Sequence, residues 1–137
     1  MTDYFQAAFG AFDPQHDQNA AAKFVLNILM MDDRLDELGD VLTDGHAIGA
    51  LEGDPGWIVE RRDSGPSGDM PGYENWPKGA NFRFYVDPSE FELAHPEVFL
   101  GAREVCNYLC KILDAYLSVK PMNTLAVQRL RRNSLSC

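Results

Sequence analysis

An apolar stripe within residues 19–38 constrains the fold of this chain more than any other feature. Its members recur at steps of four and three residues, the spacing of one face of an α-helix; they are Phe24, Ile28, Met31, Leu35 and Leu38. Asn19 is a residue type that caps helix N-termini, and Gly39 is one at which helices end. The pattern therefore predicts one continuous helix from Asn19 to about Leu38, with the stripe packed on a core.

Strand-like patterns follow this helix. A tight-turn signal at Asp44–Gly45 precedes two short apolar runs, 47–51 and 57–59, which a turn at 53–56 separates. Residues 81–87 then alternate apolar with polar side chains, as in a half-buried strand. These segments predict a hairpin or meander, and with it a small antiparallel sheet.

The last third of the sequence predicts more helices. Residues 87–90 carry the acidic cap, proline and glutamate of a short helix that Pro96 would end, and longer helical patterns cover about 102–118 and 123–132. The helix side chains that we expect to be mostly buried are Phe24, Ile28, Leu35, Leu109, Ile112 and Tyr116. Together these elements predict an α+β fold, with helices packed on an antiparallel sheet of three or four strands. We expect a single domain over residues 1–137.

Composition narrows the class of protein. The chain of 137 residues is 45% hydrophobic, which is enough apolar material for one core. Its longest apolar stretch, 24–31, is interrupted by Asn27 and is far shorter than the roughly 18–20 residues of a membrane span. The first residues lack the basic and apolar segments of a secretory signal, and the three cysteines are odd in number and lack Cys-x-x-Cys spacing. We therefore expect a reduced, cytoplasmic protein that does not bind membranes.

The charge of the chain restricts its partners. The formal net charge is −9, and residues 1–60 contain 12 acidic and 2 basic side chains. Residues 120–137 contain 4 basic side chains and no acidic one. Nucleic acid is a poor partner for such a chain, because phosphate binding needs a basic surface. A concentrated negative field instead steers basic partners and raises their association rate, although it also serves plain solubility.

The densest acidic segment lies at the C-terminal end of the predicted first helix. It contains Asp32, Asp33, Asp36, Glu37 and Asp40. Several of these residues are four apart, so that like charges stack, and the helix macrodipole disfavours an anion at this end by about 0.3–1 kcal/mol. Such a conflict is typical of a site where function overrides local stability. We interpret the segment as the recognition field for a basic partner; the alternative is a solvated helix face.

A second candidate region is the long loop 63–80, which is rich in glycine and proline. Structureless loops of this length are uncommon in compact domains and are often functional. The loop carries Tyr73 and Trp76 beside the carboxylates of Asp69 and Glu74, a combination that suits an interface with a basic partner. The alternative is that the two aromatic side chains fold back and attach the loop to the core.

Catalytic and metal-binding patterns are weak. Asp44 and His46 form an Asp-x-His pair that a tight turn explains equally well, and no third ligand has suitable spacing. Residues 64–68 form a flexible loop without the features of a nucleophile elbow or a phosphate-binding loop. Cys106 and Cys110 are four apart on an apolar helix, where buried small side chains are expected. We therefore predict no catalytic residue, no metal and no cofactor.

One family resemblance adds to these expectations. It covers residues 81–133, with the strand NFRFYVD, the segment PSEFELAHPEVFL, a helix ending in LDAYL, and then Pro121. This part of the chain resembles the C-terminal half of immunity proteins from bacterial contact-dependent growth inhibition systems. The resemblance is a pattern of residue types, and no binding residue is carried over from it. It implies a cytoplasmic protein, not an enzyme, that neutralises one cognate toxin domain, often a nuclease, at or near its active site.

The resulting hypothesis is an inhibitor whose acidic surface meets the basic surface of a nuclease toxin. Its predicted binding residues are Asp32, Asp33, Asp36, Glu37, Asp40, Asp69, Tyr73, Glu74 and Trp76. If the field lies elsewhere, the next candidates are Glu52, Asp54 and Glu60. Two alternatives remain: a small hydrolase or ligand-binding domain with loop 63–80 as its lid, and an adaptor subunit with a large exposed apolar patch.

Overall fold

The computed structural model describes residues 3–54 and 56–133 and has an α+β fold, as predicted. Within these residues the helices are α1 (Phe5–Phe9), α2 (Ala20–Met31), α3 (Leu35–Leu42), α4 (Ala102–Val119) and α5 (Thr124–Asn133). The strands are β1 (Ala50–Gly53), β2 (Trp57–Arg61), β3 (Phe82–Val86) and β4 (Glu97–Leu100). Two 3-10 turns, η1 (Pro66–Asp69) and η2 (Pro121–Asn123), complete the described elements.

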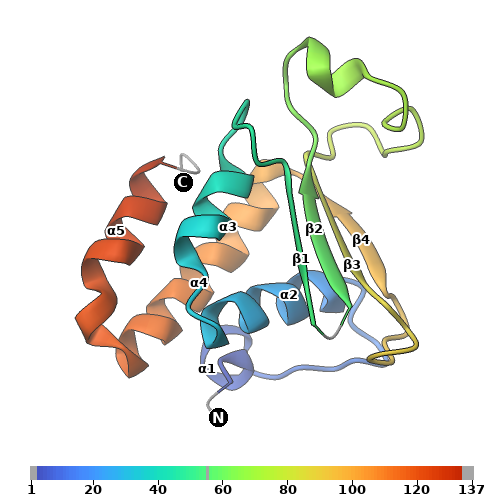
Figure 1. Ribbon diagram of the computed structural model, residues 1–137. Helices are drawn as coiled ribbons and strands as arrows, with labels where there is room; N and C mark the ends of the chain where they lie inside the picture. Colours follow the sequence, from blue (N-terminus) through green and yellow to red (C-terminus); the bar gives the residue numbers. More distant parts are fainter. Residues whose placement is uncertain (1–2, 55, 134–137) are drawn as a thin grey trace.

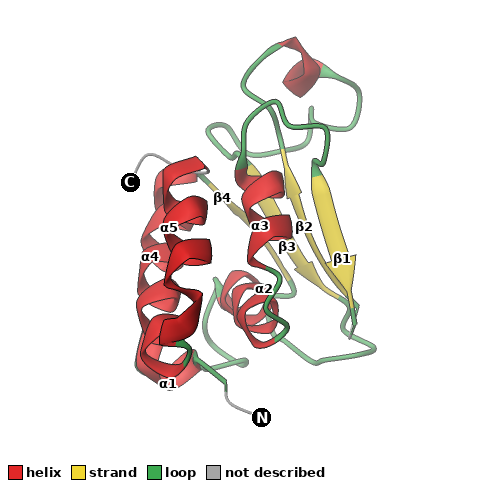
Figure 2. Cartoon of the chain, turned by 60° about the vertical axis from the view of Figure 1, so that its left-hand side comes forward, coloured by secondary structure: helices red, strands yellow, loops and turns green. Residues whose placement is uncertain are grey.

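The strands form one antiparallel sheet in the order β1-β2-β3-β4, a simple meander. Both views place the helices on one face of this sheet and leave the other face without a helix (Figures 1 and 2). The register aligns inward side chains across the strands: Val59 of β2 lies between Leu51 of β1 and Phe84 of β3. Residues one position away, such as Ile58 and Tyr85, therefore point to the open face.

The core lies between the sheet and the helices. Of the side chains expected there, Phe24, Leu35, Leu109, Ile112 and Tyr116 are buried and Ile28 is half-buried. The apolar stripes on the helices therefore predicted five of these six core side chains correctly. None of the helices in the described part of the chain is long and apolar enough to cross a membrane.

The predicted helix from 19 to 38 is wrong in one respect, because it is two helices. Asp33 has a left-handed backbone with φ 55°, and Arg34 N–H donates to the Leu29 carbonyl at 2.9 Å. Asp33 N–H donates to the Met30 carbonyl, which completes a Schellman-type helix end. This position usually holds glycine, and aspartate is one of the few other residues that tolerate it. The apolar spacing continues across the break, since α3 begins at Leu35 with its own buried face.

The short helix predicted from Asp87 is also wrong. The Asp87 carboxylate accepts hydrogen bonds from the Ser89 N–H at 2.9 Å and the Ser89 hydroxyl at 2.8 Å, which closes a turn and not a helix. After Pro96, the residues Glu97–Leu100 form β4, a strand that the sequence pattern did not predict. The edge strand was missed because four residues are too few to show a period.

Two of the cysteines lie on α4. Cys106 is buried and disulfide-bonded, whereas Cys110 is half-buried and free. The expectation that the cysteines are reduced is therefore wrong for Cys106. An odd cysteine count excludes complete pairing, but it does not exclude a single disulfide bond.

Candidate functional site

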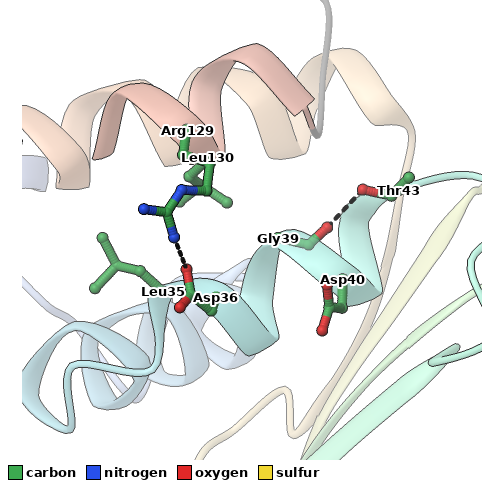
Figure 3. Close-up of a pocket in the computed structure, with 7 residues that line it drawn as sticks. All are labelled: Leu35, Asp36, Gly39, Asp40, Thr43, Arg129 and Leu130. Carbon is green, nitrogen blue, oxygen red and sulfur yellow. Dashed lines mark hydrogen bonds and ion pairs between the residues drawn. The ribbon is translucent and has the colours of Figure 1, made fainter. Parts of the chain in front are cut away.

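The acidic segment lies along α3, beside α5. A pocket of about 210 Å³ lies between the two helices. Asp36 and Arg129 point toward each other in it (Figure 3). Their Oδ1 and guanidinium nitrogen are 3.2 Å apart. Asp40 lies one turn further along α3 and points away from α5. Asp33 and Glu37 line a neighbouring pocket. We call the paired carboxylates of both pockets, with the bases that pair with them, the helix groove; these carboxylates are Asp33, Asp36, Glu37 and Asp40.

The break in the predicted helix reverses the expected helix-dipole effect for two residues of this segment. Asp36 and Glu37 lie in the first turn of α3, where the macrodipole favours anions. Asp32 is the C-cap of α2. The conflict between charge and helix dipole that we inferred from the sequence is therefore absent for Asp36 and Glu37, whereas Asp32 at the end of α2 and Asp40 in the last turn of α3 retain it.

Asp33 joins the α2–α3 turn to the end of α4. Its Oδ1 accepts hydrogen bonds from the Tyr116 hydroxyl at 2.7 Å and from the Lys120 ammonium at 2.6 Å. These two donors hold the pKa of the Asp33 carboxyl below its usual value. The Asn123 amide donates to the Tyr116 oxygen at 2.7 Å, so that Tyr116 is held from both sides. The left-handed Asp33 is thus a structural connection between helices.

The next carboxylates of the helix groove are paired as well. Arg34 donates two hydrogen bonds to Glu37, at 3.0 and 2.7 Å, and this lowers the pKa of the Glu37 carboxyl. Asp40 lies 3.5 Å from the His46 ring, a pair that is ionic only when the histidine is protonated. Asp32 is the one member of the segment with no ion pair among the described residues. Most of the predicted recognition field is therefore neutralised by the chain itself.

Arg61 anchors the other end of α3. Its side chain is 2% exposed and points from β2 into the core layer. It pairs with Asp63 at 2.6 Å and donates to the carbonyls of Asp40, Val41, His46 and Ile48. The Gly45 N–H and Arg61 together lower the pKa of the Asp63 carboxyl. Sequence reasoning missed this buried arginine, because nothing in the pattern of β2 distinguishes an inward arginine from a strand end.

The aromatic side chains of loop 63–80 lie against the sheet. Trp76 is half-buried and packs edge-on against Tyr73, with ring centroids 5.2 Å apart, and against Phe99 of β4, at 5.1 Å. The Arg62 guanidinium lies over the Tyr73 ring at 5.5 Å. These contacts favour the interpretation in which the two aromatics attach the loop to the protein.

The acids of the same loop are exposed. Asp69 lies 3.8 Å from Arg62, and Glu74 accepts a hydrogen bond from the Gly72 N–H at 2.7 Å. Figure 1 shows the loop projecting beyond one end of the sheet, whereas the α2–α3 turn lies at the opposite end of α3. The structure therefore does not bring together the loop and the whole acidic segment that the sequence assigned to one binding site.

Asp44 and His46 have local partners. Asp44 accepts hydrogen bonds from the Ser64 N–H at 2.9 Å and the Ser64 hydroxyl at 2.6 Å, which fixes the base of loop 63–80. The His46 Nδ1 accepts the Ile48 N–H at 2.9 Å. Among residues 3–54 and 56–133, no group of three or more His, Cys, Asp or Glu side chains is placed to hold a metal ion.

A second acidic surface lies at the end of the sheet where β1 meets β2, on its open face. It is a pocket of about 470 Å³ lined by Glu52, Gly53, Asp54, Gly56, Trp57, Ile58, Tyr85 and Asp87. We call its carboxylates Glu52, Asp54 and Asp87, with Ile58 and Tyr85, the sheet end. Within the described residues, none of these three carboxylates makes an ion pair. The sequence named Glu52 and Asp54 as second-choice candidates, but the approach of Asp87 depends on the β2–β3 register.

Comparison with known proteins supplies no evidence about function. No protein-family model, curated protein or solved structure matches the chain. The fold and the two surfaces define the chain as an acidic α+β protein with one helix-covered and one open sheet face. The functional argument therefore rests on the geometry and charge of those surfaces.

Proposed function

We propose that this chain is an immunity protein that binds and neutralises a cognate bacterial toxin domain, a nuclease, through an acidic surface. The observation that carries the proposal is the open face of the sheet, where half-buried Ile58 and Tyr85 lie beside carboxylates that have no basic partner in the described part of the chain. Apolar side chains within a charged rim are typical of protein interfaces. A nuclease presents a positive surface to phosphate groups, so that a negative inhibitor gains association rate and specificity.

A hydrolase with loop 63–80 as its lid receives less support from the geometry. A pocket of about 240 Å³ at the base of the loop contains Ser64 and Asp44, which are hydrogen-bonded to each other at 2.6 Å. His46, the nearest histidine in sequence, instead accepts the Ile48 N–H and faces Asp40. The three side chains therefore do not form the serine–base–carboxylate order that nucleophilic catalysis uses.

The location of the protein belongs to the same proposal. A nuclease toxin acts in the cytoplasm, and its inhibitor must be there too. Disulfide bonds are rare in that compartment, and Cys106 is disulfide-bonded, which is an argument against a cytoplasmic location. The location therefore stays a prediction. Counting free thiols in protein purified directly from bacterial cytoplasm tests it.

Growth protection tests the proposed function. A toxin domain encoded by a gene next to this one is expressed in bacteria with and without this chain. We expect the chain to restore growth, to form a stable complex with the purified domain, and to associate at least tenfold more slowly at about 500 mM than at about 50 mM salt. The proposal is wrong if no neighbouring gene encodes a domain whose toxicity the chain relieves.

A further inference from the structure

We infer that the sheet end is the docking surface and that it receives an arginine-bearing segment of the partner protein. This inference rests on the proposed function and narrows it to one surface and one kind of side chain. It departs from the sequence-based assignment, which placed the binding residues on α3 and on loop 63–80. The argument depends on charge, on rigidity and on the apolar floor of the pocket.

Charge separates the two acidic surfaces. In the helix groove, Asp33, Asp36 and Glu37 each form an ion pair with a base of the same chain. At the sheet end, Glu52 and Asp54 have neither an ion pair nor a side-chain hydrogen bond among the described residues. A cationic side chain that binds Asp33, Asp36 or Glu37 must displace an existing partner, whereas one that binds Glu52 or Asp54 breaks no ion pair of the described residues.

Hydrogen bonds and close packing fix the backbone of the sheet end. Asp87 N–H donates to the Gly56 carbonyl at 2.7 Å, which joins the β1–β2 turn to the end of β3. The Trp57 indole N–H donates to the Asp54 carbonyl at 2.9 Å. A Cβ at Gly53 would lie 2.8 Å from the Trp57 ring, so that the backbone lies directly on the indole. The backbone that carries these carboxylates is thus fixed before any partner binds, which lowers the ordering cost of binding.

The floor of the pocket suits a guanidinium group. Ile58 and Tyr85 are direct neighbours across β2 and β3, and both are half-buried. The chain already places one arginine on this ring, since the Arg83 guanidinium lies 5.1 Å from the Tyr85 centroid while it pairs with Glu60 and Glu97. A planar guanidinium combines aromatic contact with bidentate bonds to carboxylates, which an ammonium does not. Arginine is therefore the side chain that this surface fits best.

A short arginine peptide tests the site without the toxin. Acetyl-Gly-Arg-Gly-Arg-Gly-amide is titrated into 15N-labelled protein, with the lysine analogue as a second probe. We expect chemical-shift changes confined to the sheet end, larger for arginine than for lysine. Two matched variants carry the same change of charge: the sheet-end variant E52Q/D54N and the groove variant D36N/E37Q. Only the sheet-end variant should lose the response, and the dispersion of its spectrum shows whether it is folded.

The outcomes of the two experiments separate the two proposals. Shift changes centred on the α2–α3 turn, or spread evenly over the acidic surface, would overturn the docking inference. With the toxin domain in hand, E52Q/D54N should slow association about tenfold and D36N/E37Q less than twofold; equal effects would also overturn it. A wild-type chain that neither binds nor neutralises the toxin domain refutes the proposed function, while the peptide titration still decides whether the sheet end takes arginine.

Discussion

The helix groove and the sheet end contain the same kinds of acidic side chain in opposite electrostatic situations. Asp36 of the groove is paired with Arg129, which is 93 positions away in the sequence, and Asp33 with Lys120, which is 87 positions away. Glu52 and Asp54 of the sheet end have no such partner in the described part of the chain. The difference shows that a dense acidic segment is not by itself a free negative surface, because tertiary contacts decide which charges remain for a partner.

We expect the largest loss of stability from replacing Arg61, which anchors the C-terminal end of α3. Replacing buried Arg61 by methionine removes the ion pair with Asp63 and the donors to four backbone carbonyls, and we expect a loss of about 3–5 kcal/mol in the free energy of unfolding. Lys78→Met is the control, since Lys78 is an exposed base and its loss should cost less than about 0.5 kcal/mol. Urea unfolding measures both, and a loss under 1 kcal/mol for Arg61→Met would contradict the anchoring role.

Loop 63–80 is a third region, in which we expect Trp76 to contribute to stability and not to binding. Truncating Trp76 to alanine removes its contacts with Tyr73 and Phe99, and we expect a stability loss of about 1–2 kcal/mol. Toxin binding should weaken only in proportion to unfolding. Thermal melts and dissociation rates of the same variant test this, and an unchanged melting temperature with much faster dissociation would instead make Trp76 an interface anchor.

Acid titration shows whether a groove carboxylate stabilises the fold. Hydrogen bonds from Lys120 and Tyr116 lower the pKa of Asp33 in the folded state. The contribution of the Asp33 carboxylate to the free energy of unfolding is therefore fully present above its unfolded-state pKa of about 3.9. It is lost as the pH falls through the lower pKa of the folded state. Because Asp33 is half-exposed, we expect Asp33→Asn to cost only about 0.5–1 kcal/mol at pH 7 and to flatten the fall in stability below pH 4.

Asp32→Asn is the matched control for that titration. Asp32 has no ion pair among the described residues and lies at the C-terminal end of α2, so that its neutralisation should not lower the stability at pH 7. Equal pH profiles for the two variants would show that the Asp33 pairs contribute nothing.

The sequence predicted α4, α5 and most of the core well, since apolar spacing reports which side chains face inward. It failed at Asp33, because the Schellman-type end uses aspartate where glycine is usual, and the apolar spacing continues into α3. It also failed at β4, which is too short to show alternation. A local hydrogen-bond pattern decides the structure at Asp33, and pairing with β3 decides it at β4.

The candidate site was less predictable than the fold. Whether Asp36 or Asp33 is neutralised depends on α5 and on the end of α4, which no local pattern connects to α3. Likewise, Asp87 approaches Asp54 only because the β2–β3 register places Trp57 opposite Val86. A sequence shows how many acidic side chains a segment holds, but the pairing of those side chains is a property of the tertiary structure.

The most direct test of this difference is the free energy of unfolding of the two matched double variants. At about 20 mM salt, we expect D36N/E37Q to lose about 1 kcal/mol, because it breaks two ion pairs and removes two favourable charges from the start of α3. We expect E52Q/D54N to gain a few tenths of a kcal/mol, because it relieves repulsion between unpaired carboxylates. Both changes should shrink at about 1 M salt, where the Debye length is about 3 Å. Changes of the same sign in the two variants at low salt would contradict the account.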